Sequence, residues 1–143
     1  MKYSIAMLLL LFAALAQARP PAAAQPLPPI AIDDRGELVL QGDEFSYRPW
    51  RSDRNPGTVH VLQYFAGTMG DSKTFEPFTD RLIEEFGRGK LHVTTVINLD
   101  AAMWGTTGFV VSEVKSSKRK YPTSTLVLDE DGVGARTWEL GEK

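Results

Sequence analysis

The chain has 143 residues, a formal net charge of −2 at pH 7 and no cysteine. The lack of cysteine excludes thiol chemistry, from disulfide exchange to sulfenic acid formation. The near-neutral charge gives no support to a general role in binding nucleic acid. Apolar residues make up 43% of the chain, which is an ordinary share for a globular protein, so length and composition favour a single domain with its own core.

Residues 1–18 are predicted to be a secretory signal peptide. Lys2 supplies a positive charge, residues 5–16 are mostly Leu and Ala, and Ala16-Gln17-Ala18 is a small-x-small cleavage site. A second cleavage site at 22–24 is an alternative. A membrane anchor is the other interpretation, but the apolar run is too short to span a bilayer comfortably. We therefore expect cleavage after Ala18, no stable membrane anchor and a periplasmic protein.

The rest of the sequence predicts an α/β domain at 30–143, after a Pro- and Ala-rich linker at 19–29. The expected elements are a hairpin at 30–40 with its turn at 33–36, a strand at 59–65, a helix at 74–86, a strand at 91–99, a helix at 109–118, a strand at 123–128, a turn at 129–132 and a returning strand at 133–140. Alternating strands and helices favour a parallel sheet with right-handed crossovers. The mostly apolar residues 59–65 indicate a central strand covered on both faces.

The two predicted helices differ in their surfaces. The helix at 74–86 places five large apolar residues on one side, which we expect to be its buried face: Phe75, Phe78, Leu82, Ile83 and Phe86. The helix at 109–118 ends in a basic cluster, which suits the helix dipole: Lys115, Lys118, Arg119 and Lys120. This cluster is either a solvated helix end or a contact for an anionic partner or lipid surface.

The segment from Gly67 to Lys73 follows the strand at 59–65 and runs into a helix. A strand, a tight loop and a helix N-terminus form the layout of the active-site segment in thioredoxin-like proteins. Two cysteines would stand there near Met69 and Ser72. Because this chain keeps the layout without the thiols, we interpret the segment as a candidate binding loop.

Short motifs in a fixed order cover most of the chain after Pro28. They are Asp34-Arg35-Gly36-Glu37-Leu38, Phe45-Ser46-Tyr47, Val61-Leu62-Gln63-Tyr64, Ala66-Gly67, Asn98 with Asp100-Ala101, Gly105, Phe109-Val110, Tyr121-Pro122, and Asp131-Gly132 with Trp138-Glu139-Leu140. In this order and spacing the chain resembles the YtfJ family of bacterial periplasmic thioredoxin-fold proteins. The resemblance implies a thioredoxin-like fold with an added N-terminal hairpin, a periplasmic location and no established activity.

The resemblance also implies how the domain should end. Tyr121-Pro122-Thr123 is similar to the cis-proline approach to the closing hairpin of thioredoxins. A complete domain then adds a final helix on the sheet, and here the chain stops at Lys143. We therefore expect a domain without its final helix, with one face of the sheet exposing apolar surface that invites association.

Ligands of such sheets bind at the carboxyl ends of the parallel strands. The candidate binding loop there consists of Gly67, Thr68, Met69, Gly70, Ser72 and Lys73, and the candidate cleft wall opposite consists of Asn98, Asp100 and Trp104. Backbone N–H groups at the helix start, with Lys73 beside them, suit an anion. The alternatives are an ordinary loop capped by Ser72 or Thr74, and a turn closed by Asx side chains with Trp104 as a packing residue.

The two histidines do not complete a reactive site with this loop. His60 and His92 lie near the amino ends of two strands that the fold would make neighbours, a strand's length from Ser72. A serine nucleophile needs a base within hydrogen-bond reach, so a Ser-His dyad is not expected. No third ligand is spaced to complete a zinc site with the pair. We predict no catalytic residue, no metal and no cofactor.

Two functions remain open at this stage. The first is a non-catalytic binding or scaffold protein that uses the cleft between 67–73 and 98–104 for a periplasmic peptide or protein. The second is a thiol-independent enzyme that uses Ser72, Lys73 or Asp100, for which no base is visible in the sequence.

Overall fold

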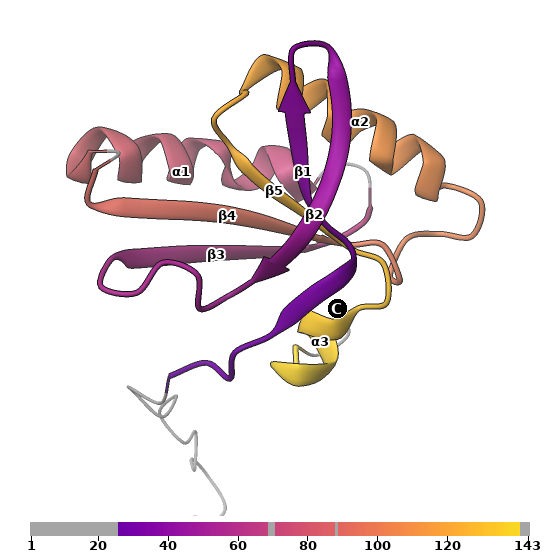
Figure 1. Ribbon diagram of the computed structural model, residues 1–143, viewed down its shortest axis with the longest axis horizontal. Helices are drawn as coiled ribbons and strands as arrows, with labels where there is room; N and C mark the ends of the chain where they lie inside the picture. Colours follow the sequence, from indigo (N-terminus) through magenta and orange to yellow (C-terminus); the bar gives the residue numbers. More distant parts are fainter. Residues whose placement is uncertain (1–25, 69–70, 88, 141–143) are drawn as a thin grey trace, which may run out of the picture.

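The computed structural model describes residues 26–68, 71–87 and 89–140, with only the backbone described at 71–75. The elements in chain order are β1 (Ala31–Gln41), β2 (Glu44–Arg51), β3 (Val59–Ala66), α1 (Asp71–Phe86), β4 (Leu91–Asn98), α2 (Thr107–Lys120), β5 (Thr125–Asp129) and α3 (Val133–Thr137). The described part of the chain is therefore a mixed α/β fold (Figure 1). This confirms the predicted class and the alternating β-α-β-α-β order of its middle.

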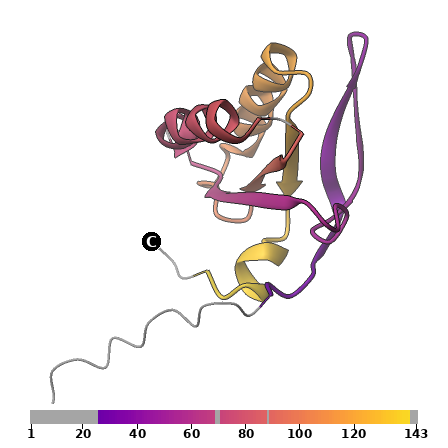
Figure 2. The ribbon, with the colours of Figure 1, turned by 90° about the vertical axis from the view of Figure 1, so that its left-hand side faces the viewer.

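The strands form one five-stranded sheet in the order β2-β1-β5-β4-β3. β3, β4 and β5 run parallel, and β1 runs antiparallel to both β5 and β2. Both βαβ steps move in the same direction across the sheet, so crossovers of one hand place α1 and α2 on the same face. Figure 2 shows these two helices together on one side of the strands and α3 on the other.

The position predicted for residues 59–65 is wrong, because β3 is an edge strand rather than a central one. An apolar run reports that both faces of a strand are covered, and it carries no information about which strands lie beside it. Here α1 lies on one face of β3. The Gln63 side-chain amide of β3 donates a 2.5 Å hydrogen bond to the Thr79 hydroxyl of α1. Tyr64 packs edge-to-face on Trp138 on the other face, with ring centroids 6.0 Å apart.

The N-terminal hairpin exists, but its turn lies elsewhere than predicted. β1 continues through residues 33–36, and the chain reverses between Gln41 and Glu44. The pairing passes from Ile32–Trp50 to Glu37–Arg48, so the turn-like residues form a bulge in one long strand. Gly36 lies at the end of this bulge with φ +71°, and a Cβ there would approach the Arg48 carbonyl oxygen to 2.2 Å. Only glycine fits that backbone conformation and that contact.

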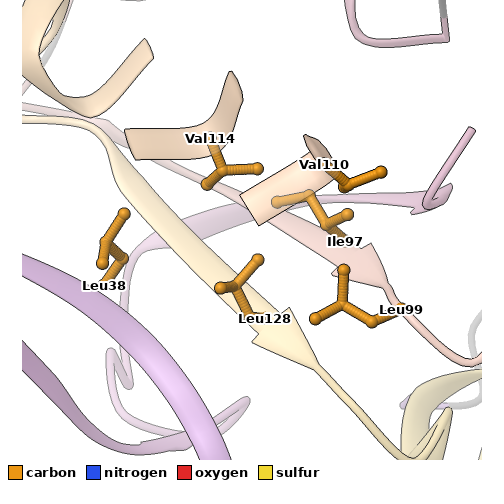
Figure 3. Packing of buried hydrophobic residues seen from close by; sticks show 6 residues of the cluster. All are labelled: Leu38, Ile97, Leu99, Val110, Val114 and Leu128. Carbon is orange, nitrogen blue, oxygen red and sulfur yellow. The ribbon is translucent and has the colours of Figure 1, made fainter. Parts of the chain in front are cut away.

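The alternation of side chains along β4 and β5 builds two cores, one on each face of the sheet. On the face of α2, Ile97 and Leu128 contact Val110 and Val114, with Leu38 and Leu99 beside them (Figure 3). On the opposite face the buried residues are Ile30, Ile32, Trp50, Val96 and Val127. The bulge moves Ile32 and Leu38 to different cores, although six positions along a regular strand would leave them on one face.

The returning strand predicted at 133–140 is wrong, because residues 133–137 form α3. The Asp129 carboxylate accepts hydrogen bonds from the backbone N–H groups of Val133 and Gly134, both at 2.8 Å, which starts a helical turn where a hairpin was expected. The place of a returning strand beside β5 is taken by β1. The sheet face opposite α1 and α2 is consequently covered at its centre by the start of β1, Trp50 and α3, rather than left open as predicted.

The described residues contain no cis peptide bond, so the bond before Pro122 is trans.

The helices extend slightly beyond their predicted bounds, and α1 is less buried than its pattern predicted. Phe78 and Phe86 are about half exposed, at 53% and 52%, while Leu82 and Ile83 are partly buried. One side of α1 therefore presents aromatic rings to solvent. Within the described ranges, no helix combines the length and the apolar character needed to cross a membrane.

Candidate functional site

The carboxyl ends of the three parallel strands meet at one edge of the sheet. Ala66 pairs with Asn98, and Asn98 pairs with Asp129, so the loops that follow begin side by side. The sequence predicted this for the first two strands, and the structure confirms that the loops starting at Gly67 and Leu99 are neighbours. The edge also includes the loop after β5, which the sequence analysis had assigned to a hairpin turn.

The predicted loop and cleft wall make direct contact through Gly67. Its backbone N–H donates to the Asn98 carbonyl at 2.7 Å. A Cβ at Gly67 would lie 2.7 Å from the same oxygen and 3.4 Å from the Cβ of Ala102. Glycine is therefore required for the close approach of two backbones, and the space between Gly67 and Asn98 is filled rather than open.

Asn98 and Asp100 act within their own turn. Asn98 is 7% exposed, and its side-chain oxygen accepts the backbone N–H of Asp100 at 3.1 Å. This is the Asx hydrogen bond that the sequence analysis considered as the alternative to a cleft wall. The loop after β5 closes over the same residues, because a Cβ at Gly132 would lie 3.2 Å from oxygens of both Asn98 and Asp100. The Asn98 side chain therefore belongs to a packed junction of two loops, whereas the Asp100 side chain beside it is exposed.

Trp104 is the residue whose setting differs most from its expected packing role. It is fully exposed, and the neighbouring Met103 is 72% exposed. Both lie in the loop between β4 and α2, just before the helix begins at Thr107. Burial of such large apolar side chains by a partner would be favourable, at roughly 25 cal/mol for each Å² of apolar surface removed from water. Trp104 and Met103 are therefore exposed large apolar side chains at this edge of the sheet.

The rest of the candidate loop is only partly described. Thr68 donates its backbone N–H to the carbonyl of Ala66 at 2.7 Å. Met69 and Gly70 lie outside the described residues. Ser72 and Lys73 lie in the first turn of α1, and their side chains are likewise outside the description.

A buried carboxylate that the sequence analysis missed organises the third loop. Asp129 is fully buried. Its carboxylate accepts a hydrogen bond from the Tyr64 hydroxyl at 2.8 Å, in addition to those from two backbone N–H groups of α3. The Tyr64 oxygen in turn accepts the backbone N–H of Ala135 at 2.9 Å. Burial, reinforced by the bond to Asp129, raises the pKa of Tyr64 well above its ordinary value of 10.0. Every polar atom in this network has a partner, so it ties α3 to β3 rather than reacting with a ligand.

A second polar link at this edge joins loops distant in sequence. The Asp34 carboxylate accepts the backbone N–H groups of Glu130 and Asp131, at 2.7 and 3.1 Å. Arg35 makes a two-pronged ion pair with Glu130, at 2.7 and 3.0 Å, and this pair lowers the pKa of the Glu130 carboxyl. The only signal in the sequence was the acidic run at 129–131, which also matches an ordinary turn. The bulge in β1 therefore anchors the loop after β5.

The histidines lie at the opposite end of the strands, as predicted. His60 pairs with His92 across β3 and β4, and their ring centroids are 5.0 Å apart. His60 lies 2.8 Å from the Thr94 hydroxyl, and burial, with a further contribution from His92, lowers the pKa of its ring. The described residues contain no group of three or more His, Cys, Asp or Glu side chains arranged to hold a metal ion.

The basic cluster on α2 is directed mostly toward the protein itself. Lys118 is 6% exposed and donates to the Ser124 carbonyl, and burial lowers its pKa. Arg119 and Lys115 lie over the Phe45 ring, at 4.7 and 5.5 Å from its centroid. Both predicted interpretations, a solvated helix end and an anion contact, are therefore wrong for Lys118. The cluster attaches the β1–β2 hairpin to α2.

Comparison with known proteins places the chain in one family. A family described as bacterial protein of unknown function, YtfJ, matches residues 22–143. An uncharacterised protein YtfJ of Escherichia coli strain K12 is 40% identical over 124 residues, which are 83% of this chain and 65% of the relative. An uncharacterised protein of Haemophilus influenzae is 32% identical over 120 residues, with the same coverage. The chain thus spans about 65% of the length of these relatives, and it belongs to the YtfJ family of bacterial proteins of unknown function.

Proposed function

We propose that this chain is an exported binding or scaffold protein with a thioredoxin-like α/β domain. Its binding surface is the loop at the carboxyl end of β4, centred on Trp104 and Met103. The partner is a periplasmic peptide or protein with an apolar contact residue. The observation that carries the proposal is the full exposure of Trp104 beside a packed junction of strand ends.

The polar groups around this surface support binding rather than chemistry. Asn98 bonds to its own turn and Asp129 bonds to α3 and Tyr64, so their hydrogen-bonding capacity is used inside the protein. In the described part of the chain, no buried side-chain nitrogen or oxygen is left without a hydrogen-bond partner. Tryptophan is among the residue types most enriched at the hot spots of protein interfaces.

The order β3-α1-β4-α2-β5 supports the thioredoxin-like assignment, and the absence of cysteine supports a role without redox chemistry. The edge position of β3 and the helix in place of a closing hairpin are departures from that assignment. We take the domain to be a variant in which the ends of the parallel strands serve as a binding surface.

Photo-cross-linking in cells tests this proposal. A photoreactive phenylalanine analogue replaces Trp104 in one variant and Asp43, at the tip of the β1–β2 turn, in a matched control. We expect a discrete adduct from position 104 only, and at least about a tenfold loss of affinity for that partner in Trp104→Ala, as for a hot-spot residue. Identical adducts from both positions, or unchanged affinity in Trp104→Ala, would contradict the proposal.

A further inference from the structure

The outer edge of β3 carries backbone groups directed away from the sheet. Among the strands that the structure describes, β3 pairs only with β4, and the bond from Gly67 N–H to the Asn98 carbonyl shows that odd-numbered residues of this segment direct their backbone N–H and C=O groups toward β4. Since backbone groups alternate along a strand, His60, Leu62 and Tyr64 direct their N–H and C=O groups outward. Within the described ranges, no turn or loop hydrogen bond engages these outward backbone groups. Figure 1 shows β3 at the margin of the sheet.

The side chains of β3 do not protect this edge. The strand reads Val-His-Val-Leu-Gln-Tyr-Phe-Ala, without proline, Asp, Glu, Lys or Arg, and Val59 is 64% exposed. The other edge strand, β2, contains Glu44, Arg48, Pro49 and Arg51. Charges and proline are the usual devices that prevent another strand from pairing with an edge. One edge of this sheet has these devices and the other does not.

The outward groups of β3 are complementary to those of a second, antiparallel copy. A two-fold axis perpendicular to the sheet leaves each side chain on the same face of the joined sheet. Paired residues must therefore be an even number of positions apart, so the axis passes beside one residue that pairs with the same residue of the copy. With the axis at Leu62, the two Leu62 residues face each other and each His60 faces Tyr64 of the copy. The outward groups of these residues then form about six hydrogen bonds.

The same axis also brings the two α1 helices together. It places the two α1 helices side by side on one face of the joined sheet, because α1 lies over β3 through the Gln63–Thr79 bond. Phe78 and Phe86 lie eight residues apart on α1, and each is about half exposed in the single chain. Backbone bonds along one strand bury little apolar area, and a stable interface needs more than about 1,000 Å². The neighbouring helices supply further area of the required apolar character.

We propose that two copies of this chain pair along β3, antiparallel about an axis at Leu62, and join their sheets into one. The interface consists of the outward backbone of β3 and the exposed side of α1. It is separate from the surface around Trp104, which lies in the loop after β4.

The test uses the chain's lack of cysteine. In the proposed register Thr58, the residue immediately before β3, faces Ala66 of the copy, and both side chains are exposed. Facing Cα atoms lie about 5.5 Å apart, within reach of a disulfide. Other pairs are too distant for a disulfide. The two Thr58 residues of a dimer lie about 26 Å apart along the strand, as do Thr58 and Ala66 of one chain. The two single-cysteine variants are therefore matched controls for each other.

The protein is purified from cells that express all 143 residues, and its mass is measured by light scattering in a dilution series up to about 100 μM, where weak interfaces assemble. We expect a dimer. After mild oxidation, a mixture of Thr58→Cys and Ala66→Cys should give a disulfide-linked dimer, and each variant alone should not. A monomer throughout the series would overturn the proposal, as would a cross-link in either variant alone or none in the mixture. Circular dichroism verifies that both variants fold, and Trp104→Ala should leave the dimer unchanged.

Discussion

Replacing Tyr64 by phenylalanine should destabilise the domain strongly, although the change removes a single oxygen atom. That oxygen donates to the buried Asp129 carboxylate and accepts the backbone N–H of Ala135. A hydrogen bond to a charged group contributes about 1.5–3 kcal/mol, and an amide left without its acceptor costs about 1 kcal/mol. Asp129 keeps its two amide donors from α3, so the loss is limited to these bonds. We expect the free energy of unfolding to fall by about 3 kcal/mol.

Urea unfolding, followed by tryptophan fluorescence and far-UV circular dichroism together, measures this loss. For a domain of this size the melting temperature should fall by about 10 °C. Tyr121→Phe is the matched control, because Tyr121 is 46% exposed and its hydroxyl interacts only with surface side chains, Glu76 at 3.4 Å and Lys120. It should change stability by less than about 0.5 kcal/mol. If the two variants are equally stable, α3 does not depend on the network of Tyr64 and Asp129.

The same network predicts how stability responds to alkali. Burial and the bond to Asp129 raise the pKa of Tyr64 in the folded protein above its unfolded value of 10.0, so folding favours the neutral phenol. This contribution is complete below pH 10 and is lost as the pH rises above it. Tyr64→Phe should therefore lose less stability than the parent protein between neutral pH and strong alkali, measured by urea midpoints across that range.

Three further predictions concern other parts of the chain. Gly36→Ala should cost about 2 kcal/mol or more, because the alanine Cβ meets the Arg48 carbonyl in a left-handed conformation; an unchanged urea midpoint would show that the bulge can relax. Burial and His92 lower the pKa of His60 below 6.5, so its share of stability is present above pH 6.5 and is lost as the pH falls. His60→Gln should flatten stability between pH 5 and 7, and an unchanged pH profile would refute this. Intact-mass analysis of the secreted protein should show Arg19 as its first residue, and retention of residues 1–18 would refute the signal peptide.

Local patterns predicted several elements close to their observed bounds. The strand predicted at 91–99 is β4, and the helices predicted at 74–86 and 109–118 are α1 and α2, each extended by two or three residues at one or both ends. These segments carry a clear periodicity of apolar residues, which reflects the face that a strand or helix buries. The neighbouring positions of Gly67 and Asn98 also followed from the sequence, since parallel strands end at one edge of a sheet.

The errors fall where the outcome depended on contacts between distant residues. Residues 133–140 alternate plausibly for a strand, but the amides of Val133 and Gly134 bond to the Asp129 carboxylate and residues 133–137 form α3. Trp104 is a typical core residue by type, but the loop after β4 holds it in solvent. Lys118 belongs to a basic run, but it is buried because α2 places it under the Ser124 carbonyl. None of these partners is recognisable from local composition.

What the sequence determined by itself is the exclusion of thiol chemistry, the α/β alternation and the membership of the YtfJ family, because these depend on residue types and their order. The tertiary structure decided that β1 rather than a C-terminal strand lies beside β5, and that β3 is left at the margin. Strand order is a choice among long-range pairings of similar apolar segments, and the packing of the whole chain makes that choice. The same choice left β3 paired on one side only within the described sheet.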